Sequence, residues 1–375
     1  MDFNLTEEQQ DVQELSRKIL EDLLTNERLK AFEASGEPFH REVWSELAKA
    51  NLLGVAIGET HGGSEMGFFS LCVLLEEIGR SVAPVPLLPT LVLGALPLQQ
   101  FGNDMQKQRW LPGVVRGETR LTAALEEEGH DDPTQPRTTA RSEGDQWRLS
   151  GRKICVPAAE GAAAVLVPAR TEAGSVAAFW VDPTANGVEL TPQVVTHRQP
   201  HFLLELDGAV GEPLGTAERG AELLRWLADR AITAVCAVQV GVSDRVLRMT
   251  AEYSGTRMQF DRPIGSFQAV HMRAADAFIH LEGMRLTMWD AAWRLDANEA
   301  AHDTVMIAKY WAAEGGQFVG YAAQHLHGGI GIDVDYPLHR YYLWAKQNEL
   351  TLGSAAVQLE TLAAGLADGS LTSPA

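Results

Sequence analysis

The stretch that decides the fold runs from Arg257 to Gln268, with the sequence RMQFDRPIGSFQ. It lies between two long segments whose apolar residues recur at helical spacing, and Pro263 and Gly265 mark it as a turn. Arginine, glutamine and phenylalanine side chains together are unusual in a plain connection between helices. They suit an anionic ligand with a flat aromatic part, because guanidinium groups pair with phosphate oxygens and aromatic rings stack on planar groups.

The composition favours a protein of a reducing compartment. The 375 residues allow two or three domains, and 45% of them are hydrophobic, which is enough for a sizeable core. A formal net charge of -19 argues against nucleic acid or an anionic membrane as a partner. The three cysteines have no paired spacing, which argues against disulfides and a zinc site. We find no signal peptide and no apolar run of about 18 residues, so we expect a cytoplasmic protein without a membrane span.

The patterns along the chain predict three domains in an α+β, mostly helical fold. Residues 1–118 have helical periodicity, which begins after a capping box at Thr6 and Gln9. Residues 119–213 carry short apolar runs between turn residues, the pattern of a small all-β domain. Residues 214–375 return to helical periodicity. The expected strands are residues 147–149, 165–167, 176–181, 188–190 and 202–206.

Several motifs, in the same order, resemble the acyl-CoA dehydrogenase family along nearly the whole chain. RMQFDRPIGSFQ resembles the family's flavin motif, and QKQRWLPGVVRGE (106–118), HLHGGIGIDVDYPLHRYY (325–342) and LTLGSAAVQ (350–358) match other family landmarks. Within the family the chain is most similar to actinobacterial members of steroid side-chain breakdown, some of which are paired unlike subunits. The resemblance implies an N-terminal α-helical domain, a middle β-barrel domain and a C-terminal four-helix bundle.

The resemblance also implies a reaction, the α,β-dehydrogenation of an acyl-CoA thioester with FAD as hydride acceptor. A carboxylate base must remove the weakly acidic α-proton. In most of the family this base is a Glu immediately before Gly-Thr, but Thr351–Ser354 places Leu352 there, and leucine cannot take a proton. A second family position falls close to Ala231, where Asp229 is the candidate base. Asp229 can equally be a solvated acid beside neighbouring arginines on a helix surface.

The residues that would hold the flavin ring within the same subunit depart from the family. Where the family has Thr-Glu-Pro and then Gly-Ser-Asp, residues 125–132 read LEEEGHDD, and the extra acids would repel phosphate groups. Glu126–Glu128 can also be a plain solvated face. Where the family has Trp-Ile-Thr after Gly151-Arg152-Lys153, this chain has Ile154–Pro157. We therefore interpret the flavin-ring pocket of this subunit as lost.

The residues that reach a neighbouring subunit's FAD are kept. By resemblance, Arg257 pairs with the pyrophosphate, the two glutamines bind the adenosine half, and the two glycines let backbone approach the adenine. His325 replaces a usual Gln and Asp261 a usual Gly. Taken alone, Arg257 could be a surface ion-pair partner and the glycines a helix stop. We expect no metal site. The predicted cofactor-binding set is Arg257, Gln259, Phe260, Gln268, His325, Gly328 and Gly329.

These observations predict a subunit of an FAD-dependent acyl-CoA dehydrogenase that lacks the catalytic Glu, with Leu352 in its place. It would complete the FAD site of a homologous partner subunit in an α2β2 heterotetramer, and the resemblance suggests a steroid side-chain CoA ester as substrate. One alternative is a self-sufficient homotetrameric enzyme that uses Asp229 as base. Another is a flavin-free scaffold subunit that keeps only the family's association surface.

Overall fold

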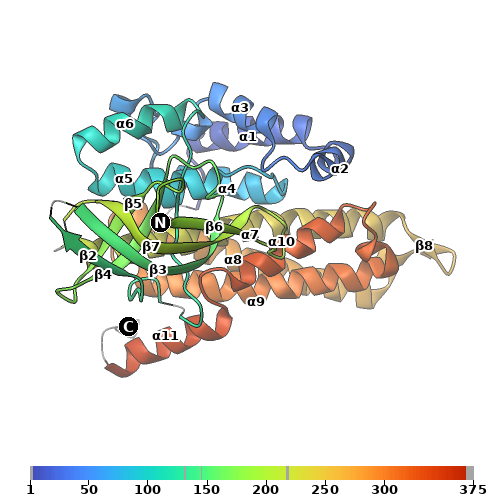
Figure 1. The fold of residues 1–375 in the computed structure, drawn as a ribbon. Coiled ribbons are helices and arrows are strands. Elements are labelled where there is room, and N and C mark those ends of the chain that lie inside the picture. The colour runs from blue at the N-terminus through green and yellow to red at the C-terminus, as the bar shows by residue number, and fades with distance from the viewer. Residues whose placement is uncertain (1–2, 131, 145, 217–218, 369–375) are drawn as a thin grey trace. The chain divides into compact units, whose positions relative to one another are not determined.

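The computed structural model describes residues 3–130, 132–144, 146–216 and 219–368 (Figure 1). The chain forms two compact units. The first contains Met1–Ser35, Cys72–Ala83 and Ile232–Ala375, and the second contains Gly36–Leu71 and Pro84–Ala231. Two helices, α4 (Gly67–Arg80) and α7 (Gly220–Thr256), contribute residues to both units.

The first unit is helical. Its N-terminal helix begins at the predicted capping box, in which the Thr6 hydroxyl accepts from the Gln9 amide and the Gln9 side chain accepts from the Thr6 amide. In Figure 1, α8 and α9 run along each other. The elements of this unit, besides the ends of α4 and α7, are α1 (Glu7–Leu23), α2 (Asn26–Ser35), β8 (Met258–Gln259), β9 (Arg262–Pro263), η5 (Ile264–Ser266), α8 (Gln268–Asp296), α9 (His302–His327), η6 (Gly328–Ile332), α10 (Leu338–Leu350) and α11 (Ala355–Asp368).

Two glycines let α4 and α7 touch through their backbones. A Cβ atom on Gly79 would lie 2.0 Å from the carbonyl oxygen of Val238, and one on Gly241 would lie 1.8 Å from the carbonyl oxygen of Glu76. Real side chains never come this close, so any larger residue at either position would force the two helices apart. This close approach places the polar residues of α4 directly against those of α7.

The second unit combines helices with a closed sheet. The strands follow the order β4-β2-β3-β7-β5, in which each strand pairs with the next, and β5 pairs with β4 to close the ring. Closure of this ring makes a barrel, with β1 added beside β4 and β6 beside β7. The elements are α3 (Arg41–Lys49), η1 (Leu52–Gly54), η2 (Glu59–His61), η3 (Leu88–Ala95), α5 (Leu96–Phe101), α6 (Asp104–Val115), β1 (Leu121–Ala123), β2 (Thr139–Glu143), β3 (Gln146–Pro157), β4 (Ala164–Thr171), β5 (Val176–Val181), β6 (Val188–Gln193) and β7 (His201–Pro213).

The predicted fold class is confirmed, since helical segments flank a middle sheet with barrel closure. All five expected strands are present, and β5 has the predicted bounds. The sequence did not predict α2, α10, β1 or β2. The division into residues 1–118, 119–213 and 214–375 remains a prediction.

The C-terminal segment 338–367 has the length and apolar composition of a membrane-crossing helix. In the structure it is two helices, α10 and α11, because the chain turns between Thr351 and Ser354. The first of these helices also carries Arg340, which pairs with Glu33 at 2.5 Å. These features match a helix pair of the first unit better than a continuous span.

A buried ion pair lies inside the second unit and corrects the solvated reading of Glu126–Glu128 for Glu127, whereas Glu128 is exposed. The carboxylate of Glu127 is 6% exposed and lies 2.6 Å from the ammonium group of Lys153, which is fully buried. Glu127 also accepts from the amide and hydroxyl of Thr138 and from the amide of Arg137. Burial opposes ionisation, but the charge and hydrogen bonds of Lys153 and Thr138 outweigh it and lower the pKa of Glu127 to about 2. The acid is therefore structural.

We predict that Lys153→Met destabilises the protein by about 3–5 kcal/mol, because it leaves the Glu127 carboxylate buried without its partner. Urea unfolding at pH 7 measures this loss. The control is the double variant Lys153→Met with Glu127→Met, which should recover most of the stability. In the parent protein, the contribution of Glu127 is complete above its ordinary pKa of 4.5 and is lost as the pH falls toward about 2. Equal stability of the single and double variants would contradict the assignment.

Candidate functional site

The predicted flavin stretch forms a tight hairpin after α7. Strand β8 pairs with β9 in the register Met258 to Pro263 and Gln259 to Arg262. The two residues between the strands, Phe260 and Asp261, have φ angles of 52° and 61°. Positive φ at both central residues is the type I′ turn, which matches the twist of a hairpin. Aspartate tolerates this conformation better than most side chains, which accounts for an Asp at a position where the family usually has Gly.

The side chains of the hairpin point to solvent. The ring of Phe260 is 86% exposed, and Arg257, Gln259 and Gln268 are exposed as well. In Figure 1 the hairpin, labelled β8, projects past the ends of α7 and α8. An exposed ring of this size is uncommon on a surface that contacts only water. The hairpin therefore has the character of a contact surface.

The surface ion-pair alternative for the hairpin arginines finds no support. Within the part of the chain that the structure describes, no carboxylate pairs with Arg257. The guanidinium of Arg262 lies over the ring of Phe267, 4.0 Å from its centroid, and Phe267 also meets Phe260 edge to face. Arg262 thus packs on the hairpin, while Arg257 is exposed and its N–H groups are available to a ligand.

The second predicted element, Gly328-Gly329, ends α9. Gly328 has φ 65° and ψ -142°, a conformation that is essentially restricted to glycine. No atom lies within 4 Å of the place that a Cβ would take on either glycine, so the backbone is open to approach from outside. The predicted residue His325 is also exposed and lies about one helical turn before Gly328.

A ring stack joins the hairpin to the glycine loop. Tyr253 lies in the last turn of α7, and its carbonyl accepts from the amide of Arg257 at 2.8 Å. Its ring stacks on His327, with centroids 4.5 Å apart and planes within 19°. His327 is held by contacts of 2.8 Å to the carbonyl of Ala323 and 3.1 Å to the hydroxyl of Tyr336. Within the first unit the structure thus brings the two predicted halves of the cofactor set together.

Sequence reasoning missed the role of Tyr253 and His327. The available signal was their position, since each aromatic ring stands next to one predicted motif: Tyr253 four residues before Arg257, and His327 directly before Gly328. Burial lowers the pKa of His327 below its ordinary value of 6.5. The ring is therefore neutral at pH 7 and stacks on Tyr253 without carrying a charge.

The turn at Leu352 is held by several hydrogen bonds and contains no carboxylate side chain. Leu352 and Gly353 have φ angles of 56° and 95°, and the side chain of Gln358 donates to the carbonyl of Leu352 at 3.2 Å. The fully buried ammonium group of Lys309 donates to two carbonyls at the end of α10, at 2.5 Å and 3.3 Å. The nearest acid along the chain, Glu349, pairs with Lys346 at 2.5 Å.

Asp229 is not the solvated surface acid that the sequence allowed. It belongs to the second unit, on α7, and is only 7% exposed. Its neighbour Arg230 is also buried, with its guanidinium 3.8 Å from the centroid of Trp226. Asp229 is thus part of the packed interior of that unit.

The middle-domain residues that depart from the family pattern, Cys155 and Pro157 among them, make contacts within the barrel. Cys155 sits at a bulge of β3 with φ 51°, and its amide donates to the side chain of Gln193 at 2.7 Å. Burial raises the pKa of the Cys155 thiol. The carbonyl of Pro157 accepts from the hydroxyl of Thr122. Neither residue offers an indole ring or a hydroxyl group to a flavin, so this part does not fit the ring of FAD, whereas the hairpin and glycine loop fit its adenosine and phosphate half.

Comparisons with known proteins agree with this geometry. The model of the acyl-CoA dehydrogenase N-terminal domain matches residues 6–118, and that of the C-terminal domain matches residues 218–367. The chain belongs to the acyl-CoA dehydrogenase family. The family is one of FAD-dependent oxidoreductases.

Its relatives include proteins named for complexes. Acyl-CoA dehydrogenase FadE27 of Mycobacterium tuberculosis is 39% identical over 98% of this chain and 99% of its own length. Among solved structures, the Tcur3481-Tcur3483 steroid ACAD shares 46% identity with a TM-score of 0.92, over 98% of this chain and 99% of that one. The ChsE4-ChsE5 complex from Mycobacterium tuberculosis shares 39% identity with a TM-score of 0.93, over 100% of both chains.

The glycine loop gives a test with a matched control. We predict that Gly328→Ala destabilises the chain by about 1–2 kcal/mol, because alanine is strained at φ 65°. Gly329→Ala should be neutral or slightly stabilising, because Gly329 has no positive φ and a Cβ there meets nothing. Urea unfolding of the two variants measures the difference, and equal stabilities would contradict the geometry of the loop.

Proposed function

We propose that this chain is the non-catalytic subunit of a heteromeric acyl-CoA dehydrogenase. It supplies the outer half of an FAD site to a homologous partner subunit, and that partner supplies the catalytic Glu and the pocket for the flavin ring. The observation that carries the proposal is the contrast within the first unit. The hairpin of Arg257 and the loop of Gly328 have the form of a ligand surface, whereas the turn at Leu352 keeps its supporting contacts and has no base.

The exposed side chains of the hairpin have the chemistry needed to bind the adenosine and pyrophosphate half of FAD. Arg257 can form paired hydrogen bonds with pyrophosphate oxygens, and Phe260 and the two predicted glutamines can cover the adenosine. A flavin held in the partner's ring pocket would supply the hydride acceptor for the acyl-CoA substrate. This chain's own residues bind and orient the distal end of the cofactor and exclude water from it.

Exposed apolar side chains on the long helices support a partner of the same fold. In the first unit, α8 exposes Met272, Phe278, Ile279 and Leu286, and α9 exposes Ile307 and Tyr321. A surface of this apolar character is unusual for a monomer and is typical of an interface between subunits. Two of the similar solved structures are named for pairs of chains, Tcur3481-Tcur3483 and ChsE4-ChsE5. We therefore propose an α2β2 assembly, with a steroid-type CoA ester as substrate.

Replacement of Arg257 tests the half-site in the purified complex. Loss of a charge-assisted hydrogen bond costs about 1.5–3 kcal/mol, so Arg257→Ala should weaken FAD binding by about 10- to 100-fold. The measurement is flavin retained after dialysis against a series of FAD concentrations. The control is Arg294→Ala, which removes an arginine of α8 that pairs with Asp290 at 3.1 Å. Unchanged flavin affinity in Arg257→Ala would reject the half-site.

Asp229→Asn separates the proposal from a self-sufficient enzyme. If Asp229 were the base, its loss would lower kcat by about 100- to 10,000-fold. We expect turnover by the complex to stay within about tenfold, because Asn keeps the size of the side chain and the base comes from the partner. Acyl-CoA-dependent reduction of an artificial electron acceptor measures this. A loss of turnover with flavin still bound would favour the homomeric enzyme.

A further inference from the structure

The first unit contains a cavity of about 450 Å³ lined by five arginines. It lies among α1, α2, α7, α10 and the end of α4, and none of its lining residues belongs to the hairpin or the glycine loop. Glu21 is the one acid among the residues that line it. This is a marked local excess of cations in a chain with a formal net charge of -19. The five arginines are Arg17, Arg80, Arg245, Arg248 and Arg340.

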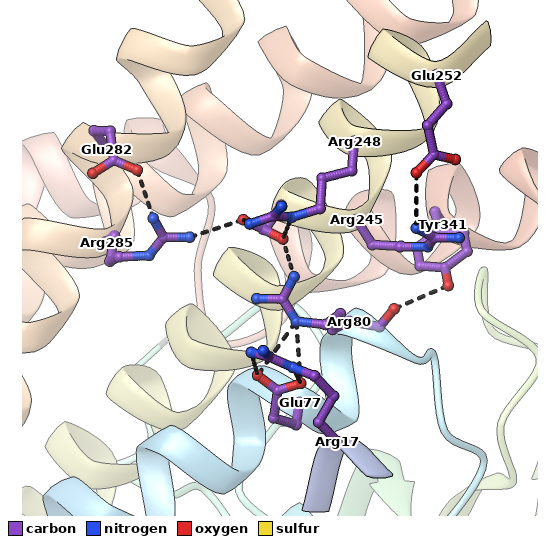
Figure 2. Close-up of polar contacts among 10 residues, drawn as sticks. Arg17, Glu77, Arg80, Arg245, Arg248, Glu252, Glu282, Arg285 and Tyr341 are labelled. Atoms are coloured by element: carbon purple, nitrogen blue, oxygen red, sulfur yellow. Dashed lines mark hydrogen bonds and ion pairs between the residues drawn. The ribbon is translucent and has the colours of Figure 1, made fainter. Parts of the chain in front are cut away.

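Two buried carboxylates, Glu77 and Asp244, hold three of these five arginines (Figure 2). Glu77 accepts from Arg17 at 2.8 Å and from Arg80 at 3.1 Å. Asp244 accepts from Arg80, from Arg248 at 2.8 Å and from Arg285 at 3.2 Å. Four guanidinium groups therefore share two carboxylates, and among the residues that the structure describes only Arg285 of these four pairs with a further acid, Glu282, at 2.5 Å.

The electrostatics of Asp244 agree with a cation-rich surrounding. Its burial opposes ionisation, but the hydrogen bond from Arg248 and the charges of Arg80, Arg248 and Arg285 outweigh that effect and lower its pKa. The carboxylate stays charged at neutral pH and holds its arginines in place. This leaves their remaining N–H groups directed elsewhere, since each guanidinium has five donors and a carboxylate has two oxygens.

Three of the five arginines remain accessible from the cavity. The side chains of Arg248, Arg245 and Arg17 are 64%, 39% and 36% exposed. The nearest carboxylate to Arg245 is Glu252 at 3.7 Å, beyond hydrogen-bonding distance. By contrast, Arg340 is 6% exposed and its guanidinium is occupied by Glu33 and Asn26.

Helix dipoles do not decide the sign of the cavity. The helices α2 and α10 begin at its wall, where Thr25, Asn26 and Pro337 line it. The helices α1 and α4 end there, at Leu24 and Arg80. The positive and negative ends nearly cancel, so the arginine side chains determine the potential.

We propose that this cavity binds a small phosphate-bearing anion, with Arg17, Arg245 and Arg248 as its ligands. Guanidinium groups match phosphate oxygens in pairs, and the volume lies within the usual range of small-ligand pockets. Arg80 and Arg340, fixed by their acids, form the rigid wall behind the ligand. The site is separate from the FAD half-site and does not depend on it.

Titration calorimetry of the full chain with inorganic pyrophosphate tests this proposal, and the variant Arg257→Ala shows whether the hairpin is the site being titrated. The expected result is saturable binding at constant ionic strength, at least about tenfold weaker in Arg245→Gln and Arg248→Gln. Arg294→Gln, which removes a half-buried arginine of α8 that pairs with Asp290, and Arg257→Ala should leave it unchanged.

Absence of saturable binding to the parent chain would overturn the proposal. So would equal affinity in Arg245→Gln or loss of binding in Arg257→Ala, since these results would move the anion to another place. Arg245→Gln is the decisive variant because it breaks no hydrogen-bonded ion pair, the distance to Glu252 being 3.7 Å. Circular dichroism on each variant verifies that it is folded before titration.

Discussion

The half-site depends on one contact, the stack of Tyr253 on His327. Each ring belongs to the end of a different long helix, and each lies next to one of the two motifs that would meet the cofactor. Without this contact the hairpin would be a tip at the end of α7, free to change its direction relative to the glycine loop. With it, the ends of α7 and α9, some seventy residues apart in sequence, are held against each other next to Arg257 and Gly328.

The turn at Leu352 is held by contacts that need no acid at the position where the resemblance expects the base. The ammonium group of Lys309 holds the end of α10, and Gln358 holds the carbonyl of Leu352. All of these contacts go to backbone carbonyls, so they do not depend on which side chain stands at position 352. The turn therefore keeps its structure with leucine at position 352.

Local patterns were enough to predict much of the fold. The capping box at Thr6, the strand 176–181 and the turn after α7 each depend on residues close together in sequence. The strand β2 was not predicted because its sequence TARSE is mostly polar, and its residues are mostly exposed on the barrel. The helix α10 was not predicted because its buried side includes the polar residues Arg340 and Asn348, so that residues 338–350 show no apolar stripe. In both cases tertiary pairing, not local preference, decided the structure.

The parts that sequence reasoning could not supply are all contacts over long separations. Glu127 becomes structural only because Lys153, 26 residues away, is buried beside it. The arginine-lined cavity is formed by side chains from five helices. The sequence spacing of Arg17, Arg80 and Arg245 does not indicate that they lie close together. Exposure was also hidden. The sequence named Phe260 as an aromatic face, but only the structure adds that its ring is 86% exposed.

The visible spectrum of the purified chain tests the account most directly, first alone and then co-expressed with a candidate partner of the same family. We expect a colourless chain alone and a flavin band in the mixture, at about one FAD per pair of unlike chains, because each partner site would need one hairpin from this chain. A full flavin band from this chain alone would contradict the account, since it would mean that the barrel residues around Cys155 and Pro157 hold a flavin ring after all.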